Sequence, residues 1–428
     1  MRTEYKIDNV IGLELSRSKS GKMLKGAEMP FVKLNVKYQV SIYFRRMRNY
    51  FLLIIVAILF SGCSRKDNPN EPAFTDLQEE INSLAEKYVI AGAMVGVIDL
   101  QQNKSTYSFG RKSFDSPEPP DADTVFEIGS ITKTFTAILA ADMFSKGLID
   151  NQIVGHYLPA DKVKMPSRDG AQITFTHLLR HTSGIPMKPF VHTPGKTFSF
   201  LESKMPLPEG FDIVDPYAAY TTEYIYEYLT SYCTLEFKPG TRWEYSNTGY
   251  GLLGHTLGLI DGTSYESILG RNIFDVLDMN NSSLFLTEQQ LTNVASGHDG
   301  SKKKAPFWTA QDILQGCGMI KSSLNDMFKY LEANMGLVQS PLRGAMKRTH
   351  RRTPELYTGS YGHTGWQWYI LELQDGQEII WSGGATNGQR AFIAFNPSIL
   401  TGAIILLNVQ GAEQLKFGCE LMMAINNY

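Results

Sequence analysis

Cysteine is scarce in this sequence, and its few cysteines lack the spacings that mark a disulfide framework or a structural zinc site. There are four, with no Cys-x-x-Cys pair: Cys63, Cys233, Cys317 and Cys419. Two further hydrolase signatures are also missing, because the chain contains neither Gly-x-Ser-x-Gly nor His-Glu-x-x-His. These absences argue against a disulfide-stabilised scaffold, a zinc protease and a hydrolase with a nucleophile elbow.

The chain has no excess of either charge. Lys and Arg number 41 against 43 Asp and Glu, for a formal net charge of −2, so nothing in the charge indicates nucleic acid or an acidic partner. Hydrophobic residues make up 43% and charged residues 20% of the 428 positions. These values are typical of a globular protein with ample core. The sequence contains no internal repeat, and it does not indicate an oligomeric state.

Near the N-terminus the apolar run Phe51–Phe60 is too short to span a bilayer as a stable helix, but it suits the core of a signal peptide. Basic residues precede the run, and Ser61-Gly62-Cys63 follows it, as at a bacterial lipoprotein cleavage site. We therefore expect a lipoprotein-type signal peptide over residues 47–63, with Cys63 as the lipid attachment residue. An N-terminal membrane anchor helix is the alternative, and it implies much the same location.

This expectation divides the chain into segments. Signal peptides start at the initiator methionine, so we interpret residues 1–46, which are polar and rich in Lys and Arg, as an upstream extension or basic tail. Residues 64–73 would form a linker and residues 74–428 the folded domain. The protein is then expected to be exported and anchored to a membrane, in the periplasm or at the cell surface.

The hydrophobic pattern predicts a mixed α/β (α+β) fold. Amphipathic periodicity predicts helices over Leu77–Tyr88 and Gln414–Asn426. Strands are predicted over Ala91–Leu100, Ser105–Arg111, Gln367–Leu373, Glu378–Trp381, Arg390–Phe395 and Gly402–Val409. Because strands lie at both ends and helices between them, we expect an antiparallel sheet flanked by helices and completed by both termini, with a mostly helical second lobe. The Pro- and Gly-rich segment Pro186–Pro216 is interpreted as an ordered excursion near the site.

The stretch Phe126–Phe144 reads as a buried helix, because apolar or small residues occupy every face. Ser130 begins it, and Lys133 follows three positions later, so the hydroxyl and the amine share one helix face. Burial favours the neutral form of an amine, and a neutral amine beside a serine hydroxyl is a general base beside a nucleophile. The alternative is an N-cap serine followed by a lysine that reaches solvent. Other Ser-x-x-Lys strings, such as Ser301–Lys304, lie in polar surroundings.

Two later motifs could complete such a site. Tyr245-Ser246-Asn247 precedes an apolar, Gly-rich helix start; a tyrosine there can carry a proton and Asn247 can bind an amide. Trp381-Ser382-Gly383-Gly384 ends a predicted strand, where a glycine-flanked edge can pair with a substrate and supply N–H groups to an oxyanion hole. The alternatives are a turn with a packed aromatic residue and a plain Gly-Gly turn.

Taken in order, these motifs resemble the serine β-lactamase and penicillin-binding-protein superfamily, specifically its class C-like branch. The resemblance runs from about residue 75 to 425 and includes the blocks around Ser130, Leu178–Pro186, Phe237–Gly254, Gly316–Met327 and Phe392–Pro397. It implies a β-lactamase/transpeptidase-like fold and a serine hydrolase that needs no metal or cofactor.

The resemblance also implies roles for individual residues. Ser130 would be the nucleophile, Lys133 the base that activates it, and Tyr245 the relay that passes the proton to the leaving group. Asn247 would bind substrate beside the strand residues Trp381, Ser382, Gly383 and Gly384. The N–H groups of Ser130 and Gly384 would form the oxyanion hole.

One departure from the family pattern concerns substrate. The third motif usually begins with Lys or His, and here Trp381 stands in that place. The loss of this cation weakens the case for β-lactams and D-alanine peptides, whereas Trp-x-Gly occurs in the family VIII carboxylesterases, which share the fold. The segment Ala385–Gly388 is also one residue longer than usual.

Two hypotheses follow. The first is a secreted, lipid-anchored serine hydrolase that forms an acyl-enzyme on Ser130 and hydrolyses a small ester or amide, of the carboxylesterase, β-lactamase or D-amino-peptidase type. The second, motivated by Trp381, is a catalytically weakened penicillin-binding or sensor protein that acylates without efficient turnover. In either case the partner is a small ester, amide or peptidoglycan-like peptide.

Three motifs are set aside. The string Gly249-x-Gly251-x-x-Gly254 matches a dinucleotide fingerprint, but no βαβ unit surrounds it, so helix packing is expected. The pair His177 and His181 has no evident third metal ligand. The string His363-Thr364-Gly365 lies before the strand where the third motif belongs.

Overall fold

The computed structural model describes residues 76–189, 205–353 and 363–427. The predicted signal peptide, Cys63, the linker and the N-terminal extension lie outside these residues, as does part of the segment Pro186–Pro216. Within the described ranges no helix combines the length and the apolar character needed to cross a membrane. The cysteines of these ranges, Cys233, Cys317 and Cys419, are free thiols, as expected.

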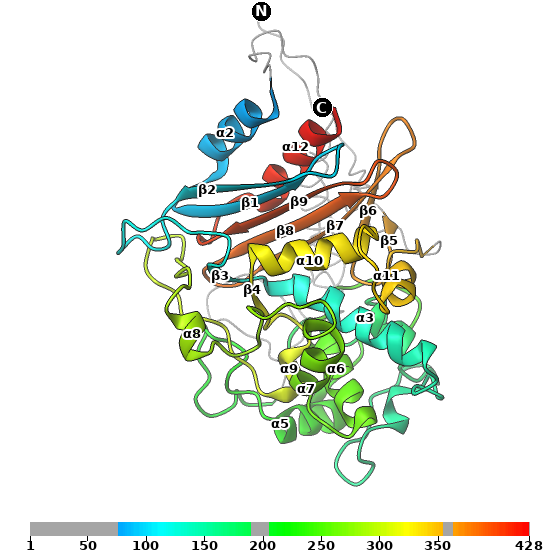
Figure 1. Ribbon diagram of the computed structural model, residues 1–428. Coiled ribbons are helices and arrows are strands. Elements are labelled where there is room, and N and C mark those ends of the chain that lie inside the picture. Colours follow the sequence, from blue (N-terminus) through cyan, green and yellow to red (C-terminus); the bar gives the residue numbers. More distant parts are fainter. Residues whose placement is uncertain (1–75, 190–204, 354–362, 428) are drawn as a thin grey trace, which may run out of the picture. The chain divides into compact units, whose positions relative to one another are not determined.

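A seven-stranded sheet joins the two ends of the domain. Its order is β2-β1-β9-β8-β7-β6-β5, and each neighbouring pair is antiparallel. The strands are β1 Gly92–Ile98, β2 Lys104–Gly110, β5 His363–Thr364, β6 Tyr369–Glu372, β7 Glu378–Ala385, β8 Arg390–Asn396 and β9 Thr401–Leu407. Because β1 pairs with β9, strands from both ends complete one sheet, as the sequence predicted (Figure 1).

The two faces of the sheet carry different helices. Helix α2 (Leu77–Tyr88) and helix α12 (Gln414–Asn427) cover one face, where their apolar residues pack with those of β1, β7, β8 and β9. The predicted bounds of α2 are confirmed. The opposite face carries α3 (Thr132–Ser145) and α10 (Leu324–Met335) and leads into the helical lobe (Figure 1). The sheet therefore separates an α2/α12 face from an α3 face.

The helical lobe consists mainly of short helices. They are α4 Phe175–Leu179, α5 Thr222–Glu227, α6 Asn247–Asp261, α7 Tyr265–Leu269, α8 Glu288–Leu291, α9 Asp312–Gln315 and α11 Arg343–Thr349. Two single turns of 3-10 helix are η1 Gly129–Ile131 and η2 Val154–His156, and two single turns of π-helix are η3 Tyr228–Tyr232 and η4 Gly270–Phe274. The strands β3 (Val125–Glu127) and β4 (Lys321–Ser323) form a small antiparallel pair, and β3 comes directly before η1 in the chain.

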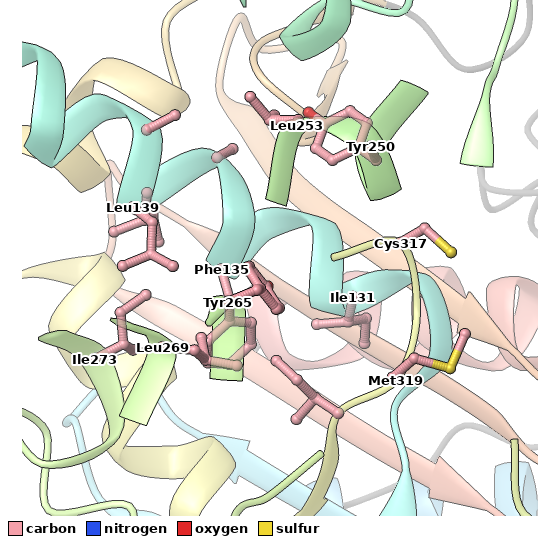
Figure 2. Close-up of a cluster of buried hydrophobic side chains, with 14 of the residues drawn as sticks. Ile131, Phe135, Leu139, Tyr250, Leu253, Tyr265, Leu269, Ile273, Cys317 and Met319 are labelled. Atoms are coloured by element: carbon pink, nitrogen blue, oxygen red, sulfur yellow. The ribbon is translucent and has the colours of Figure 1, made fainter. Parts of the chain in front are cut away.

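Helix α3 runs through the middle of this lobe and is buried on all sides along most of its length. Figure 2 shows Ile131, Phe135 and Leu139 packed among side chains of α6, α7 and the segment that carries Cys317. Its threonines avoid unpaired hydroxyls by hydrogen bonding, as Thr134 does with Tyr330 at 2.7 Å and Thr136 with Tyr265 at 2.8 Å. The predicted buried helix is confirmed over Thr132–Ser145, with Ser130 in the turn η1 that precedes it, whereas Phe126 and Glu127 at the start of the predicted stretch belong to β3.

The glycines of α6 allow close helix packing. A Cβ at Gly251 would lie 2.7 Å from the carbonyl oxygen of Ile313, and one at Gly254 would lie 2.9 Å from the ring of Tyr265. Such distances leave no room for a side chain, so the dinucleotide-like string is explained by packing against α7 and α9, as expected.

Candidate active site

Ser130 is presented by a sharp turn between β3 and α3. Gly129, which precedes it, has φ +50°, a left-handed conformation that favours glycine. A Cβ there would also lie 2.5 Å from the backbone nitrogen of Ala385. Gly129 is therefore required both by its conformation and by the close approach of β7, and together these place Ser130 against the end of β7.

Lys133 is fully buried and points to Ser130. Its Nζ lies 3.0 Å from Ser130 Oγ and also donates to the carbonyl oxygen of Cys317. The amine sits 4.8 Å from the centre of the Tyr245 ring. No carboxylate appears among these contacts, so Lys133 is directed at the serine and is not held in an ion pair.

Tyr245 completes the cluster from the segment before α6. Its hydroxyl lies 2.8 Å from Ser130 Oγ. The structure thus brings together Ser130, Lys133 and Tyr245, which lie on two segments more than a hundred residues apart. The competing string Ser301–Lys304 lies in an exposed turn.

His181 packs against Tyr245, a role that the sequence did not indicate. The two rings lie 4.4 Å apart, and the backbone N–H of Ser246 donates to His181 Nδ1 at 3.1 Å. Nε2 then carries the proton and donates to Gln367 Oε1 at 2.7 Å. Burial lowers the pKa of His181 to about 3, so the ring is neutral and holds the backbone next to Tyr245 in place.

The burial of His181 predicts a pH dependence of stability. Its unfolded pKa is 6.5 and its folded pKa is about 3, so between these values the unfolded chain binds one proton more than the folded chain. The free energy of unfolding should therefore fall as the pH falls, by about 1.4 kcal/mol per pH unit from this group. Between pH 7 and pH 5 the free energy of unfolding of His181→Gln, measured by urea denaturation, should fall by about 2 kcal/mol less than that of the parent. An unchanged slope would contradict the assignment. His350, which is also buried with a pKa of about 3, provides the matched comparison as His350→Gln.

Asn247 lies at the start of α6, and only one of the two polar atoms of its side-chain amide is hydrogen-bonded. Its Nδ2 donates to the hydroxyl of Tyr217 at 2.6 Å, whereas its buried Oδ1 has no hydrogen-bond partner among the described residues. Tyr217 in turn packs edge-on against Trp308 at 5.1 Å. An unpaired buried acceptor is costly unless a ligand uses it, so Asn247 remains a candidate for binding a substrate N–H group.

The predicted substrate strand, β7, divides its side chains between the two faces of the sheet. Trp381 is buried on the α2/α12 face, stacked on Tyr369 at 4.7 Å and packed with Phe392. Gly383 faces the same way, since a Cβ there would meet Leu415 of α12. Because side chains alternate along a strand, Ser382 and Gly384 face α3. The structure therefore does not bring the Trp381 side chain to Ser130.

Ser382 occupies the place on the α3 face where the family pattern has a cation. It is fully buried, and its Oγ has no hydrogen-bond partner among the described residues. Gly384 follows two positions later, where a Cβ would lie 1.8 Å from the carbonyl oxygen of Ile128 and 3.0 Å from the nitrogen of Ser130. The strand is thus displaced by one residue from the register inferred from the sequence, which agrees with the longer segment Ala385–Gly388.

The same alternation identifies the N–H group that faces Ser130. The backbone N–H of Thr386 donates to the carbonyl of Gln389 at 3.0 Å across the β7–β8 turn, so the even-numbered residues of β7 direct their backbone groups toward β8. The N–H of Gly384 therefore points to β8, whereas that of Ala385 points to the other side of β7, where the pairing with β6 has ended, next to Gly129. Ala385 rather than Gly384 is placed to pair with Ser130 in an oxyanion hole.

Gly384 is nevertheless needed for the close approach of β7. We expect Gly384→Ala to push β7 away from η1 and to lower the rate of Ser130 acylation by about 100-fold, as a displacement of about 1 Å does at other active sites. Stopped-flow acylation kinetics would measure this. Gly300→Ala adds the same methyl group where no atom lies within 4 Å and should leave the rate unchanged. A normal rate in Gly384→Ala would refute the close contact.

The two histidines considered as metal ligands have other partners. His177 Nδ1 accepts from the N–H of Thr174 at 3.2 Å within the cap of α4, and His181 is engaged as described above. No cluster of three or more His, Cys, Asp or Glu side chains in the described ranges is arranged to hold a metal ion. His363 and Thr364 form β5 at the far edge of the sheet, away from β7.

Comparison with known proteins places this geometry in context. The family model described as Beta-lactamase matches residues 77–420. A beta-lactamase from Pseudomonas fluorescens is 27% identical over 399 residues, which cover 82% of this chain and 99% of that protein. Penicillin-binding protein 4* from Bacillus subtilis is 26% identical over 275 residues, covering 60% of this chain and 55% of its own.

Solved structures agree in fold. The beta-lactamase/D-alanine carboxypeptidase from Pseudomonas syringae superposes with a TM-score of 0.66 at 21% identity, covering 82% of this chain and 98% of its own. A class C beta-lactamase superposes with a TM-score of 0.65 at 22% identity, covering 81% and 94%. The seven-stranded sheet and its flanking helices are therefore those of the class C beta-lactamase fold.

Proposed function

This chain belongs to the beta-lactamase family, and from that premise and the geometry around Ser130 we propose that it hydrolyses a small ester or amide through an acyl-enzyme. The family resemblance and the assignment as a serine hydrolase, both inferred from the motifs, are confirmed by the match over residues 77–420. One observation carries the proposed chemistry: Ser130 Oγ lies within hydrogen-bond distance of both Lys133 Nζ and Tyr245 OH.

Acylation follows from these contacts. The Ser130 hydroxyl proton passes to Lys133 Nζ along the 3.0 Å contact as Oγ forms a bond to the substrate carbonyl carbon. The carbonyl oxygen becomes an oxyanion, which accepts hydrogen bonds from the backbone N–H groups of Ser130 and Ala385. When the tetrahedral intermediate collapses, the bond to the leaving group breaks, and Tyr245 transfers a proton to that group. An ester on Ser130 remains.

Deacylation uses the same groups in reverse order. Tyr245, which has given its proton to the leaving group, accepts a proton from the water molecule that attacks the ester carbonyl, while Lys133 still holds the proton taken from Ser130. The second oxyanion occupies the same pair of N–H groups, and the proton returns to Ser130 Oγ as the acyl group leaves. The free acid is released and the serine is regenerated.

The substrate class depends on the strand beside Ser130. Neither Trp381, which faces away, nor Ser382, which is neutral, provides the cation expected there, so substrates without a carboxylate should be accepted. Relatives of this chain are named beta-lactamases and a D-alanine carboxypeptidase, so β-lactams and D-alanyl peptides remain within the proposal. The alternative of a weakened sensor protein has less support, because the Trp381 side chain that motivated it does not enter the site.

Turnover assays test the proposal directly. Steady-state hydrolysis of p-nitrophenyl acetate and of benzylpenicillin, followed beside intact-mass spectrometry of the protein, should show multiple turnovers with at least one of them and a transient adduct with the mass of the acyl group. A stoichiometric adduct without turnover would favour the sensor protein. No adduct and no hydrolysis with either compound would refute the proposed function.

A further inference from the structure

A buried acid lies directly behind Ser130 and is not used by the chemistry above. Glu127 is the last residue of β3, three positions before Ser130, and its side chain is 3% exposed. A carboxylate is seldom buried so deeply unless it is paired or hydrogen-bonded. Its partners therefore indicate what it does.

Two partners of Glu127 belong to the turn that follows Ala385. Its Oε2 accepts a hydrogen bond from Thr386 Oγ1 at 2.7 Å, and its backbone N–H donates to Gln389 Oε1 at 2.8 Å. Thr386 is the residue next to Ala385 and closes the β7–β8 turn with Gln389. Glu127 thus joins the strand that precedes Ser130 to the turn that follows Ala385, whose N–H group is the second oxyanion donor.

Further contacts hold this connection in one geometry. Thr386 Oγ1 accepts from the N–H of Gln389 at 3.1 Å, and Gln389 Nε2 donates to the carbonyl of Ala295 at 2.8 Å. The other carboxylate oxygen of Glu127 accepts from the N–H of Trp308 at 2.6 Å. Thr386 and Gln389 are buried as deeply as Glu127, so water cannot replace these bonds when one is removed.

A buried lysine balances the charge. Lys321 of β4 donates to the carbonyl oxygens of Leu284 and Trp308 and lies near both Glu127 and Asp215. Burial raises the pKa of Glu127, and the attraction of Lys321 opposes that rise. A buried charge that lost this compensation would be costly, so the acid and the lysine depend on each other.

We propose that Glu127 is a positioning residue that, through Thr386, sets the separation between the Ser130 and Ala385 N–H groups of the oxyanion hole. This inference rests on the proposed function and extends it to a residue that touches no substrate. Oxyanion donors act only when they lie about 2.7–3.1 Å from the developing charge. Ser130 and Ala385 belong to segments far apart in the chain, so a dedicated connection is needed to hold their N–H groups that closely.

Thr386→Val provides the test, because it keeps the shape of the side chain and removes the hydroxyl. We expect the rate constant for Ser130 acylation to fall about 10- to 100-fold, with the KM for p-nitrophenyl acetate changed less than about twofold. Thr386→Ser restores the hydroxyl and should recover most of the rate. Glu127→Gln keeps the volume and should reproduce the loss, and the double variant should lose little more than either single variant.

Thr401→Val is the matched control. Thr401 is buried at the end of β9 and donates to Asn426 Oδ1 at 2.6 Å, so the variant loses a comparable bond far from β7. Both threonine variants should lose thermal stability, but only Thr386→Val should lose acylation rate. Affinity for phenylboronic acid, which forms a tetrahedral adduct with serine, should fall in parallel in Thr386→Val and Glu127→Gln.

The outcomes distinguish this inference from the function on which it rests. A parent protein that forms no adduct with any probe refutes the proposed function, and the inference with it. A parent that acylates, together with a Thr386→Val variant that keeps the parental rate and boronate affinity, refutes the positioning role alone. Equal losses in Thr386→Val and Thr401→Val would likewise assign Thr386 a purely structural role.

Discussion

Ser130→Ala should abolish both adduct formation and turnover, with the rate of acyl transfer reduced by roughly four orders of magnitude or more. The substitution removes the oxygen to which Lys133 and Tyr245 both point, at 3.0 and 2.8 Å, and with it the nucleophile of the proposed mechanism. Ser130 begins a helix that is fixed by its other buried residues, so the fold should be retained. Intact-mass spectrometry after mixing with p-nitrophenyl acetate or benzylpenicillin measures the loss.

The chain contains its own control for this experiment. Ser301 also begins a Ser-x-x-Lys string but lies in an exposed turn, so Ser301→Ala should acylate at the parental rate. An adduct that persists in Ser130→Ala would show that another residue is the acyl acceptor. Mapping that adduct by peptide mass spectrometry would identify the residue and overturn the proposed mechanism.

Lys133→Met should produce the second largest effect, a fall of about 100- to 10,000-fold in the acylation rate. Methionine occupies nearly the same buried channel as the lysine chain, so the helix should remain packed. What is lost is the amine beside Ser130 Oγ and its bond to the carbonyl of Cys317. Without the amine, the serine proton has no nearby base on the α3 side. Stopped-flow kinetics with p-nitrophenyl acetate would measure the rate, and thermal unfolding would verify the fold.

Lys304→Met, which changes the exposed lysine of the string at Ser301, should leave the rate unaltered. If Lys133→Met acylates as fast as the parent, then Lys133 is not the base. Tyr245, 2.8 Å from Ser130 Oγ, would be the remaining candidate. Tyr245→Phe would then show the large loss in its place, and the roles of the two residues in the proposed mechanism would be exchanged.

Much of this protein could be predicted from sequence alone, because the relevant signals are local. The amphipathic period of Leu77–Tyr88 predicted α2 with its observed bounds. The Ser130–Lys133 pair depends only on the geometry of one helical turn, and the buried helix that contains it follows from its apolar composition. The order of strands and helices was sufficient for the antiparallel sheet shared by both ends, because few arrangements bury such a pattern.

The third motif shows what local sequence patterns cannot predict. The sequence predicted that the strand ends at Trp381, with Gly384 in the oxyanion hole. In the structure β7 continues to Ala385, because Gly384 and Ala385 pair with Ala391 and Arg390 of β8. Side chains and backbone groups change direction at every residue of a strand, so a register difference of one residue turns Trp381 away from Ser130 and brings the N–H of Ala385 to it.

The sequence by itself therefore determined the family and the sheet, and it singled out Ser130, Lys133 and Tyr245 as candidates, each of which stands in a recognisable string. Only the tertiary structure decided which residues of β7 face the site, how Gln367 holds His181 beside Tyr245, and how Glu127 reaches Thr386. Those contacts join residues nearly two hundred or more positions apart. They are set by strand register and by burial, which no local pattern of residues encodes.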